Sequence, residues 1–294
     1  MLTLRIGIVQ YELAPLQTEA DFWDGIRQDV EQAKADQVRL LIYPEYLTAH
    51  LLALSSPLAH DQAAPYIDGF TERYIRFFSD LSRDSGIIIL AGTHIHREGN
   101  GYVNEAYLFF PDGRIETQQK LHLTPEERNC WHLTPGNHLN VIDTEFGRMA
   151  ILICYDIEFP ELSRIVAQQD VVLILNPTYT DQAAGYYRVR YCAQARAIEN
   201  QRFVALSGMV GMLPYIPQID AGYAESGCFS PCDYPFPPNG ILNIAPDAQK
   251  TVVIADLNLS ELKRNWAQGQ VSPYKDRKPE LYQQLAKQVP NSSR

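Results

Sequence analysis

The stretch Met149-Ala-Ile-Leu-Ile-Cys154-Tyr-Asp-Ile-Glu-Phe-Pro160-Glu161 decides the fold of this chain. Its apolar run predicts a buried strand that stops at Cys154, and Pro160 predicts the start of a helix shortly afterwards. Cys154 should therefore lie on a sharp strand-to-helix connection, which projects a side chain beyond the sheet. That place suits a nucleophile, because Tyr155 N–H can face an oxyanion and the helix N-terminus favours thiolate. Taken alone, the segment also fits a small apolar cysteine that ends a buried strand.

Short apolar runs alternate with amphipathic stretches in both directions from this segment. They predict strands at 4–10, 40–43, 87–92, 104–110, 115–120, 148–153, 171–175, 203–208 and 251–256, and helices at 21–35, 71–82, 160–168 and 186–199. The turn residues Pro111-Asp112-Gly113 join two of these strands as an antiparallel hairpin. Hairpins mixed with strand-helix-strand units predict an α/β fold that has mixed sheets with helices outside.

Length and composition predict one large domain. The 294 residues are 46% hydrophobic and 20% charged, which is enough to bury a full core. We assign residues 1–260 to this domain. Residues 261–294 read as a polar C-terminal tail of the same domain, with a helical fragment at 279–288, and we expect the tail to pack on a partner subunit.

Composition also argues against several classes of protein. No apolar run reaches the roughly 20 residues of a membrane helix and residues 1–10 lack a basic leader, so we expect a cytoplasmic protein with no membrane partner. A formal net charge of −10 and a pI near 5.2 argue against a nucleic-acid partner. Five cysteines, an odd number, fit a reducing compartment. His94 and His96 share a strand face, but two ligands make no zinc site.

Two further strand ends carry the groups that a thiol nucleophile requires. The strand at 40–43 runs into Pro44-Glu45, which leaves a carboxylate at the edge where α/β proteins gather their sites. Beside apolar walls this carboxylate gains proton affinity, so it can take the thiol proton and pass it to a leaving nitrogen. The strand at 115–120 ends in Lys120, whose ammonium can stabilise negative charge on an attacked carbonyl oxygen. Each residue alone is typical of a surface loop, and the combination predicts a catalytic site.

The ordered motifs resemble those of the nitrilase, or carbon–nitrogen hydrolase, superfamily in its amidase-like branch. They are Leu-Ile-Tyr-Pro-Glu45, Lys120-Leu-His-Leu-Thr-Pro and Cys154-Tyr-Asp-Ile-Glu-Phe-Pro-Glu, and the resemblance spans nearly the whole chain. It implies an α-β-β-α sandwich of two mixed sheets that dimerises to α-β-β-α-α-β-β-α. It implies catalysis by Glu45, Lys120 and Cys154 without cofactor or metal. A second glutamate common in the family matches Glu127, with Glu126 as the alternative.

The resemblance implies a thiol amidohydrolase that releases an acid and ammonia or an amine through a cysteine thioester. Cys-Tyr-Asp is typical of amidase and carbamoylase branches, so we expect a small linear amide or carbamoyl substrate. Omega-amidase-like branches carry an arginine where this chain has Glu158. If Glu158 faces the substrate, the substrate should carry a neutral or cationic group; an ion pair with Arg188 or Arg190 is the alternative.

The predicted substrate-binding residues are Tyr155, Glu158, Thr178 and Tyr179, because the last two follow another strand end. Asp181 in the same loop is expected to cap the following helix. Acyl transfer, nitrile hydrolysis and a non-catalytic scaffold are alternative functions for the same fold. A papain-like enzyme would require His122 or His138 to reach the thiol.

Overall fold

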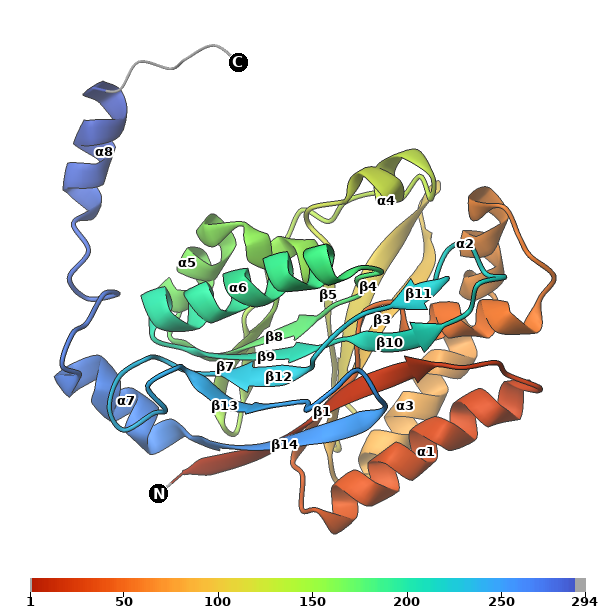
Figure 1. Cartoon of the computed structure of the whole chain (residues 1–294), viewed down its shortest axis with the longest axis horizontal. Coiled ribbons are helices and arrows are strands. Elements are labelled where there is room, and N and C mark those ends of the chain that lie inside the picture. Colours follow the sequence, from red (N-terminus) through yellow and green to blue (C-terminus); the bar gives the residue numbers. More distant parts are fainter. Residues whose placement is uncertain (1, 289–294) are drawn as a thin grey trace.

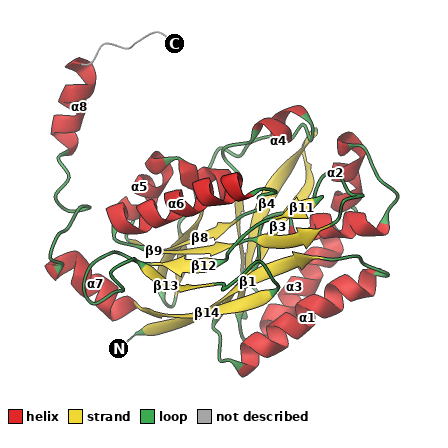
Figure 2. Cartoon of the chain, viewed as in Figure 1, coloured by secondary structure: helices red, strands yellow, loops and turns green. Residues whose placement is uncertain are grey.

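Four layers make up residues 2–288, the part of the chain that the computed structural model describes. Two mixed β-sheets face each other, and helices cover both outer faces (Figures 1 and 2). Helices α1 (Glu19–Ala35) and α3 (Thr71–Ser85) lie on one side, and α5 (Pro160–Gln168) and α6 (Ala183–Asn200) lie on the other. The predicted α-β-β-α sandwich is confirmed. Residue 1, from the segment predicted to lack a leader, and residues 289–294, from the predicted tail, lie outside the described part.

The first sheet has eight strands within residues 2–288. Seven follow the order β11 (Ala221–Gly222), β10 (Met209–Met212), β1 (Thr3–Leu13), β2 (Leu40–Ile42), β3 (Ile88–Glu98), β4 (Gly101–Phe109) and β5 (Ile115–Gln119), and β14 (Thr251–Asn258) also pairs with β1. The pairs β10–β1, β1–β2 and β2–β3 are parallel, whereas β3–β4 and β4–β5 are antiparallel. The predicted hairpin is the β4–β5 pair.

The second sheet has six strands within the same residues. Their order is β13 (Ile241–Ile244), β12 (Gly227–Phe229), β9 (Phe203–Ser207), β8 (Val171–Pro177), β7 (Gly147–Ile151) and β6 (Ile142–Thr144). The central pairs β7–β8 and β8–β9 are parallel, and the outer pairs are antiparallel. The strand that precedes Cys154 is therefore in a different sheet from the strands that precede Glu45 and Lys120.

The period-two alternation of the first sheet fills two hydrophobic cores. Ile6 and Ile8 of β1 join the core that the two sheets share, whereas Val9 and Tyr11 join the core under α1 and α3. Each large apolar side chain buried in this way stabilises the fold by about 1.5–3 kcal/mol. Helix α1 begins at a capping box, in which the Thr18 side chain accepts a hydrogen bond from the N–H of Asp21.

The strand predicted at 203–208 is confirmed as β9, and the chain changes sheets directly after it, at Gly208. Strand β9 ends at Ser207 in the second sheet, and β10 continues from Met209 in the first. Gly208 makes this crossing possible, because a side chain at that position would overlap Ala224. Residues 203–212 carry no clear signal that the chain changes sheets, so only the tertiary structure reveals the change.

Several short elements were not predicted individually. They are α2 (His60–Asp68), α4 (Pro125–Asn129), α7 (Leu259–Gln268), the 3-10 segments Leu47–Leu54 and Cys154–Glu158, and the strands β6, β10, β11, β12 and β13. Helix α2 contains Pro65, which interrupts the expected pattern. The predicted domain boundary at 260 falls inside α7, whose Leu259 and Leu262 belong to the core.

The tail helix predicted at 279–288 is present as α8 (Pro279–Gln288) and extends away from the sandwich (Figure 1). None of its residues is buried in the described chain. Packing of this helix on a partner subunit stays a prediction. Within residues 2–288, no helix combines the length and apolar character needed to cross a bilayer.

A close approach of two loops fixes the position of Glu45. Gly92 in β3 has a φ of +65°, and a side chain there would overlap the carbonyl oxygen of Pro44. The next residue, Thr93, accepts a hydrogen bond at its side-chain oxygen from the N–H of Tyr46, at 2.8 Å. Residues 92 and 93 therefore hold the chain on both sides of Glu45.

We expect Gly92→Ala to reduce both stability and activity, because the methyl group would displace Pro44 and with it Glu45. Gly86→Ala is the matched control, since Gly86 also has a positive φ, of 74°, but has no atom near the added methyl group. Backbone strain should cost about 1–2 kcal/mol in each variant, and the overlap should bring Gly92→Ala to about 3 kcal/mol or more. Denaturant unfolding measures both losses. Equal losses would show that Pro44 imposes no constraint.

Candidate active site

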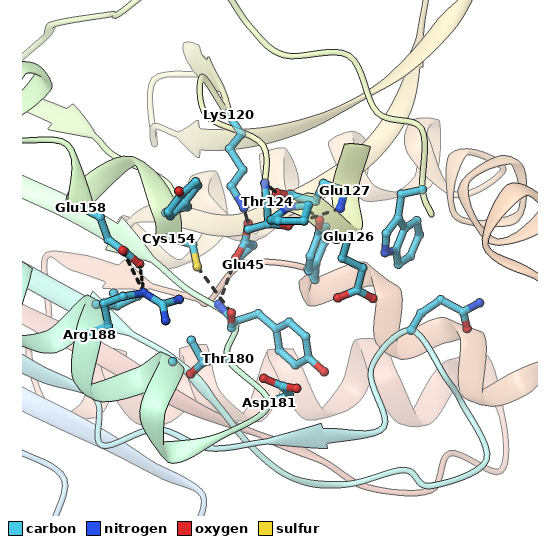
Figure 3. Close-up of a pocket in the computed structure, with 18 of the residues that line it drawn as sticks. Glu45, Lys120, Thr124, Glu126, Glu127, Cys154, Glu158, Thr180, Asp181 and Arg188 are labelled. Atoms are coloured by element: carbon cyan, nitrogen blue, oxygen red, sulfur yellow. Dashed lines mark hydrogen bonds and ion pairs between the residues drawn. The ribbon is translucent and has the colours of Figure 1, made fainter. Parts of the chain in front are cut away.

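Four predicted catalytic residues line one cavity of about 480 Å³ (Figure 3). Glu45 follows β2 and Lys120 follows β5, both in the first sheet. Glu127 lies on α4, and Cys154 begins the 3-10 segment that follows β7 of the second sheet. All four side chains are buried, at 5% exposure or less. The sandwich thus brings three distant stretches of chain to one place.

Lys120 is at the centre of a buried charge cluster. Its Nζ donates to Oε1 of Glu45 at 2.7 Å and lies 2.8 Å from Oε2 of Glu127. Burial alone would lower the pKa of Lys120, but the two carboxylates outweigh it and raise the pKa well above the ordinary value. The ammonium therefore stays charged, as a group that stabilises an oxyanion must.

The choice between Glu126 and Glu127 follows from the start of α4. Thr124 and Glu127 form a capping box: the Thr124 N–H donates to Oε2 of Glu127 at 2.8 Å, and Thr124 Oγ1 accepts from the Glu127 N–H. This arrangement turns Glu127 towards Lys120. Glu126 lies at the edge of the cavity, with its side chain 56% exposed. The spacing Thr-x-x-Glu in the sequence is the signal that distinguishes the two glutamates.

The pKa values of the two buried carboxyl groups, Glu45 and Glu127, are shifted in opposite directions. Burial raises the pKa of Glu45, and Lys120 only partly opposes this effect. For Glu127 burial also acts to raise the pKa, but Lys120 and further donors, including the hydroxyl of Tyr46 at 2.6 Å, lower it overall. A pair of carboxylates separated in this way can divide acid–base work. Glu45 is suited to exchange protons, and Glu127 is suited to stay ionised.

Cys154 has a strained backbone, with a φ of +44°. Its Sγ–H donates to the carbonyl oxygen of Tyr179 at 3.4 Å. Burial raises the pKa of this thiol and Glu45 raises it further, while Lys120 lowers it less. Burial and Glu45 therefore outweigh any stabilisation of a thiolate by the helix N-terminus in the resting site. The thiol is neutral and needs a base, which Glu45 can provide.

Two residues of this cluster escaped the sequence analysis. Asn104 on β4 donates from Nδ2 to Oε1 of Glu45 at 2.9 Å and to Oε1 of Glu127 at 3.2 Å. Tyr46 follows Glu45 and bonds Glu127 as described. The hairpin was the sequence feature that could have identified Asn104. Its register places Asn104 opposite Lys120, and the Lys120 N–H donates to the Asn104 carbonyl at 2.9 Å.

Asp156 connects the segment of Cys154 to the strand end of Lys120. Its buried carboxylate accepts from the N–H groups of Leu121 at 3.2 Å and His122 at 2.8 Å. The imidazole Nδ1 of His122 lies 3.0 Å from the same carboxylate, and its ring stacks on Phe159. His122 is thus engaged away from the thiol, which removes the basis for a papain-like arrangement with this histidine.

Three of the four predicted substrate-binding residues line the cavity: Tyr155, Glu158 and Tyr179. Thr178 does not. It is fully buried, its N–H donates to the carbonyl of Ser207, and its side chain interacts with the thiol of Cys154. Thr180 lines the cavity instead.

The structure also answers two open questions, on Glu158 and on Asp181. Glu158 faces the cavity and also binds Arg188, whose Nε lies 2.8 and 2.9 Å from its two oxygens, so the alternative of an ion pair is present. Asp181 does not cap α6. The N-cap is Gln182, which has no side-chain capping bond, and Asp181 lines the cavity.

Comparison with known proteins agrees with this fold. The model of the carbon-nitrogen hydrolase family matches residues 5–265. The chain belongs to the carbon–nitrogen hydrolase family. It is therefore a hydrolase of carbon–nitrogen bonds, as the Glu45, Lys120 and Cys154 motifs predicted.

Relatives of this carbon–nitrogen hydrolase include named amidases. The chain is 39% identical over 279 residues to "Probable hydrolase YhcX" of Bacillus subtilis (strain 168), a match that covers 95% of this chain and 54% of that protein. The chain thus spans about half the length of this relative. It is 24% identical over 292 residues to "Omega-amidase NIT2" of Danio rerio, covering 96% of this chain and 97% of that protein.

Among solved structures, the carbon-nitrogen hydrolase from Helicobacter pylori G27 has the same fold. The TM-score is 0.77 at 19% sequence identity, and the match covers 97% of this chain and 98% of that one.

We expect Asn104→Leu to move the acid limb of the kcat/KM pH profile to higher pH. A base must be deprotonated to act, and the Asn104 amide favours the ionised form of Glu45. Without this donor the pKa of Glu45 should rise further. Asn243→Leu, at an exposed amide, is the control. If the acid limb is unchanged in Asn104→Leu, Glu45 is not the group whose ionisation produces that limb.

We expect Asp156→Asn to lower kcat with little change in KM, because the strand end that carries Lys120 loses an acceptor. The amide oxygen can still accept from one of the N–H groups of residues 121 and 122, but the amide NH2 would face the other, and stability should fall by about 1–3 kcal/mol. Steady-state kinetics and denaturant unfolding measure the two effects. Asp143→Asn, at a side chain 81% exposed, is the control. A loss confined to stability would contradict a positioning role.

Proposed function

We propose that this carbon–nitrogen hydrolase converts a small linear amide or carbamoyl compound to an acid and ammonia or an amine through a thioester on Cys154. The observation that carries the proposal is a buried ammonium, Lys120, bonded to two carboxylates beside a neutral thiol in one cavity. A thiol, a base of raised pKa and a fixed cation are the groups that acyl transfer to sulfur requires.

In the first half of the reaction, Glu45 takes the proton from Sγ of Cys154 as sulfur bonds to the amide carbon. The carbonyl oxygen becomes an oxyanion, and Lys120 with the N–H of Tyr155 stabilises it. The carbon–nitrogen bond then breaks, and Glu45 returns its proton to the leaving nitrogen. Ammonia or an amine departs, and the acyl group remains on sulfur as a thioester.

In the second half, water attacks the thioester. Glu45 takes a proton from the water, the same two donors hold the second oxyanion, and the carbon–sulfur bond breaks. The proton returns to sulfur, the acid leaves, and the enzyme regains its starting state. Glu127 keeps its negative charge throughout, so it positions Lys120 and the water rather than transferring a proton.

Two observations favour an amide over a nitrile. The nucleophile motif reads Cys-Tyr-Asp, as in the amidase and carbamoylase branches, and a relative that aligns over almost its whole length is an omega-amidase. Acyl transfer uses the same thioester, with an amine in place of water. A homodimer, the packing of the tail on a partner and a cytoplasmic location stay predictions.

We expect Cys154→Ala to abolish ammonia release from a panel of short linear amides and carbamoyl compounds, by at least about a thousandfold in kcat/KM. The fold should be preserved, since the replacement is small. Cys232→Ala, at an exposed cysteine, is the control and should retain activity.

Product analysis separates hydrolysis from transfer. Free acid as the sole product, with and without an added amine acceptor, is expected for a hydrolase, whereas a new amide formed at the expense of acid would indicate an acyltransferase. Ammonia release that survives in Cys154→Ala would overturn the proposed mechanism.

A further inference from the structure

The cavity carries more negative charge than the reaction needs. Besides the catalytic cluster and the Glu158–Arg188 ion pair, its wall includes three carboxylates, Glu126, Asp181 and Asp220. Figure 3 shows Glu126 and Asp181 across from the Glu158–Arg188 pair. These carboxylates come from α4 and from two loops, so no single element accounts for their placement.

No lysine or arginine among residues 2–288 forms an ion pair with any of the three carboxylates at the 4 Å limit. Glu126 lies 3.4 Å from Nε2 of His60, and Asp181 accepts a bond from the Gln182 amide at 3.4 Å. All three carboxylates act electrostatically on Tyr179. After burial, the charges of Asp220, Asp181 and Glu126 are the largest causes that raise the pKa of its hydroxyl group. Their charges therefore act together on the space beside Tyr179.

The aromatic rings beside Tyr179 are a second, independent observation on the kind of ligand that the cavity binds. Tyr46, Trp131 and Tyr179 all line the cavity. Tyr46 stacks on Trp131 with ring centroids 5.7 Å apart, and it meets Tyr179 edge to face at 6.0 Å. Aromatic rings next to carboxylates attract an organic cation in two ways: the quadrupole of the ring attracts it, and so does the negative charge of the carboxylates. A carboxylate ligand would meet repulsion from the same groups.

Arg188 is the one cation on the wall apart from Lys120, within the described residues. Its Nε is already shared by both oxygens of Glu158, so the charge of the pair is balanced. An acidic substrate would have to compete with Glu158 for Arg188 and pass three carboxylates. The charges of this cavity thus disfavour an acidic acyl chain.

We propose that the substrates are amides whose acyl chain ends in an amine, with the ammonium bound between the aromatic rings and the carboxylates of Glu126, Asp181 and Asp220. This inference rests on the proposed function, because it places the amide carbonyl at Cys154 and the ammonium at the opposite side of the same cavity. It assigns specificity to three residues that take no part in the chemistry.

The test compares three amides of equal chain length that differ only at the far end. They are hexanamide, aminohexanamide with a terminal amine, and adipic acid monoamide with a terminal carboxylate. Shorter terminal amines, down to aminopropanamide, locate the best length. We expect kcat/KM to be highest for an amine-bearing amide, about tenfold or more above its neutral counterpart, and lowest for the acid. Added salt should reduce the preference.

Variants link the preference to the carboxylates. The triple variant Glu126→Gln, Asp181→Asn and Asp220→Asn should lose most of the preference for the amine, measured as the ratio of kcat/KM for aminohexanamide to kcat/KM for hexanamide in the same variant. Each single variant should lose about two- to fivefold. Asp24→Asn on α1, where Asp24 pairs with Arg27, is the matched control for removal of a surface charge.

The outcomes separate this inference from the proposed function. If hexanamide is hydrolysed in a Cys154-dependent way but the acid is preferred, or if the triple variant keeps the preference for the amine, the assignment of an amine-bearing substrate is wrong and the amidase remains. If none of the amides, at any length, gives Cys154-dependent ammonia, the proposed function itself fails.

Discussion

The buried ammonium of Lys120 is the interaction on which the rest of the site depends. A charge removed from water is tolerated only when it is paired, and Lys120 is paired with Glu45 and Glu127 at 2.7 and 2.8 Å. Two carboxylates that share one cation are not equivalent. Glu127 receives additional donors and stays ionised, whereas Glu45 is left with the higher proton affinity and lies beside the thiol. In the proposed mechanism, one ion cluster thus provides both the base and the cation that stabilises the oxyanion.

The packing of the two sheets in the sandwich places this ion cluster beside Cys154. The acid and the amine follow strands of the first sheet, and the thiol follows a strand of the second. Their separation is therefore set by how the two sheets pack, and close contacts fix it. Gly92 admits the Pro44 carbonyl, and Asp156 ties the segment of Cys154 to the strand end of Lys120. Rigid elements of this kind supply the preorganisation that electrostatic catalysis requires.

In the proposed function and the proposed specificity, the reaction and the choice of substrate depend on different parts of the cavity. The proposed catalytic groups are all buried; Glu45, Lys120 and Cys154 follow strands, whereas Glu127 lies on α4. The carboxylates of Glu126, Asp181 and Asp220 lie on the rim, on loops and on a short helix, where sequence changes leave the core intact. A common reaction can in this way serve substrates of different charge, since the rim selects the acyl chain without touching the reacting atoms.

Strand periodicity and turn residues predicted mixed sheets with helices outside and the β4–β5 hairpin, because these are local signals of the sequence. The motifs at Glu45, Lys120 and Cys154 implied the sandwich and the candidate catalytic residues through their resemblance to the carbon–nitrogen hydrolase family. The sequence also held the hairpin register that pairs Asn104 with Lys120 and the capping box that selects Glu127. Only the tertiary structure decided the proton affinities, the change of sheet at Gly208, the burial of Thr178 and the Glu158–Arg188 pair. These depend on what lies next to a residue across the fold, and such neighbours leave no mark in the order of the chain.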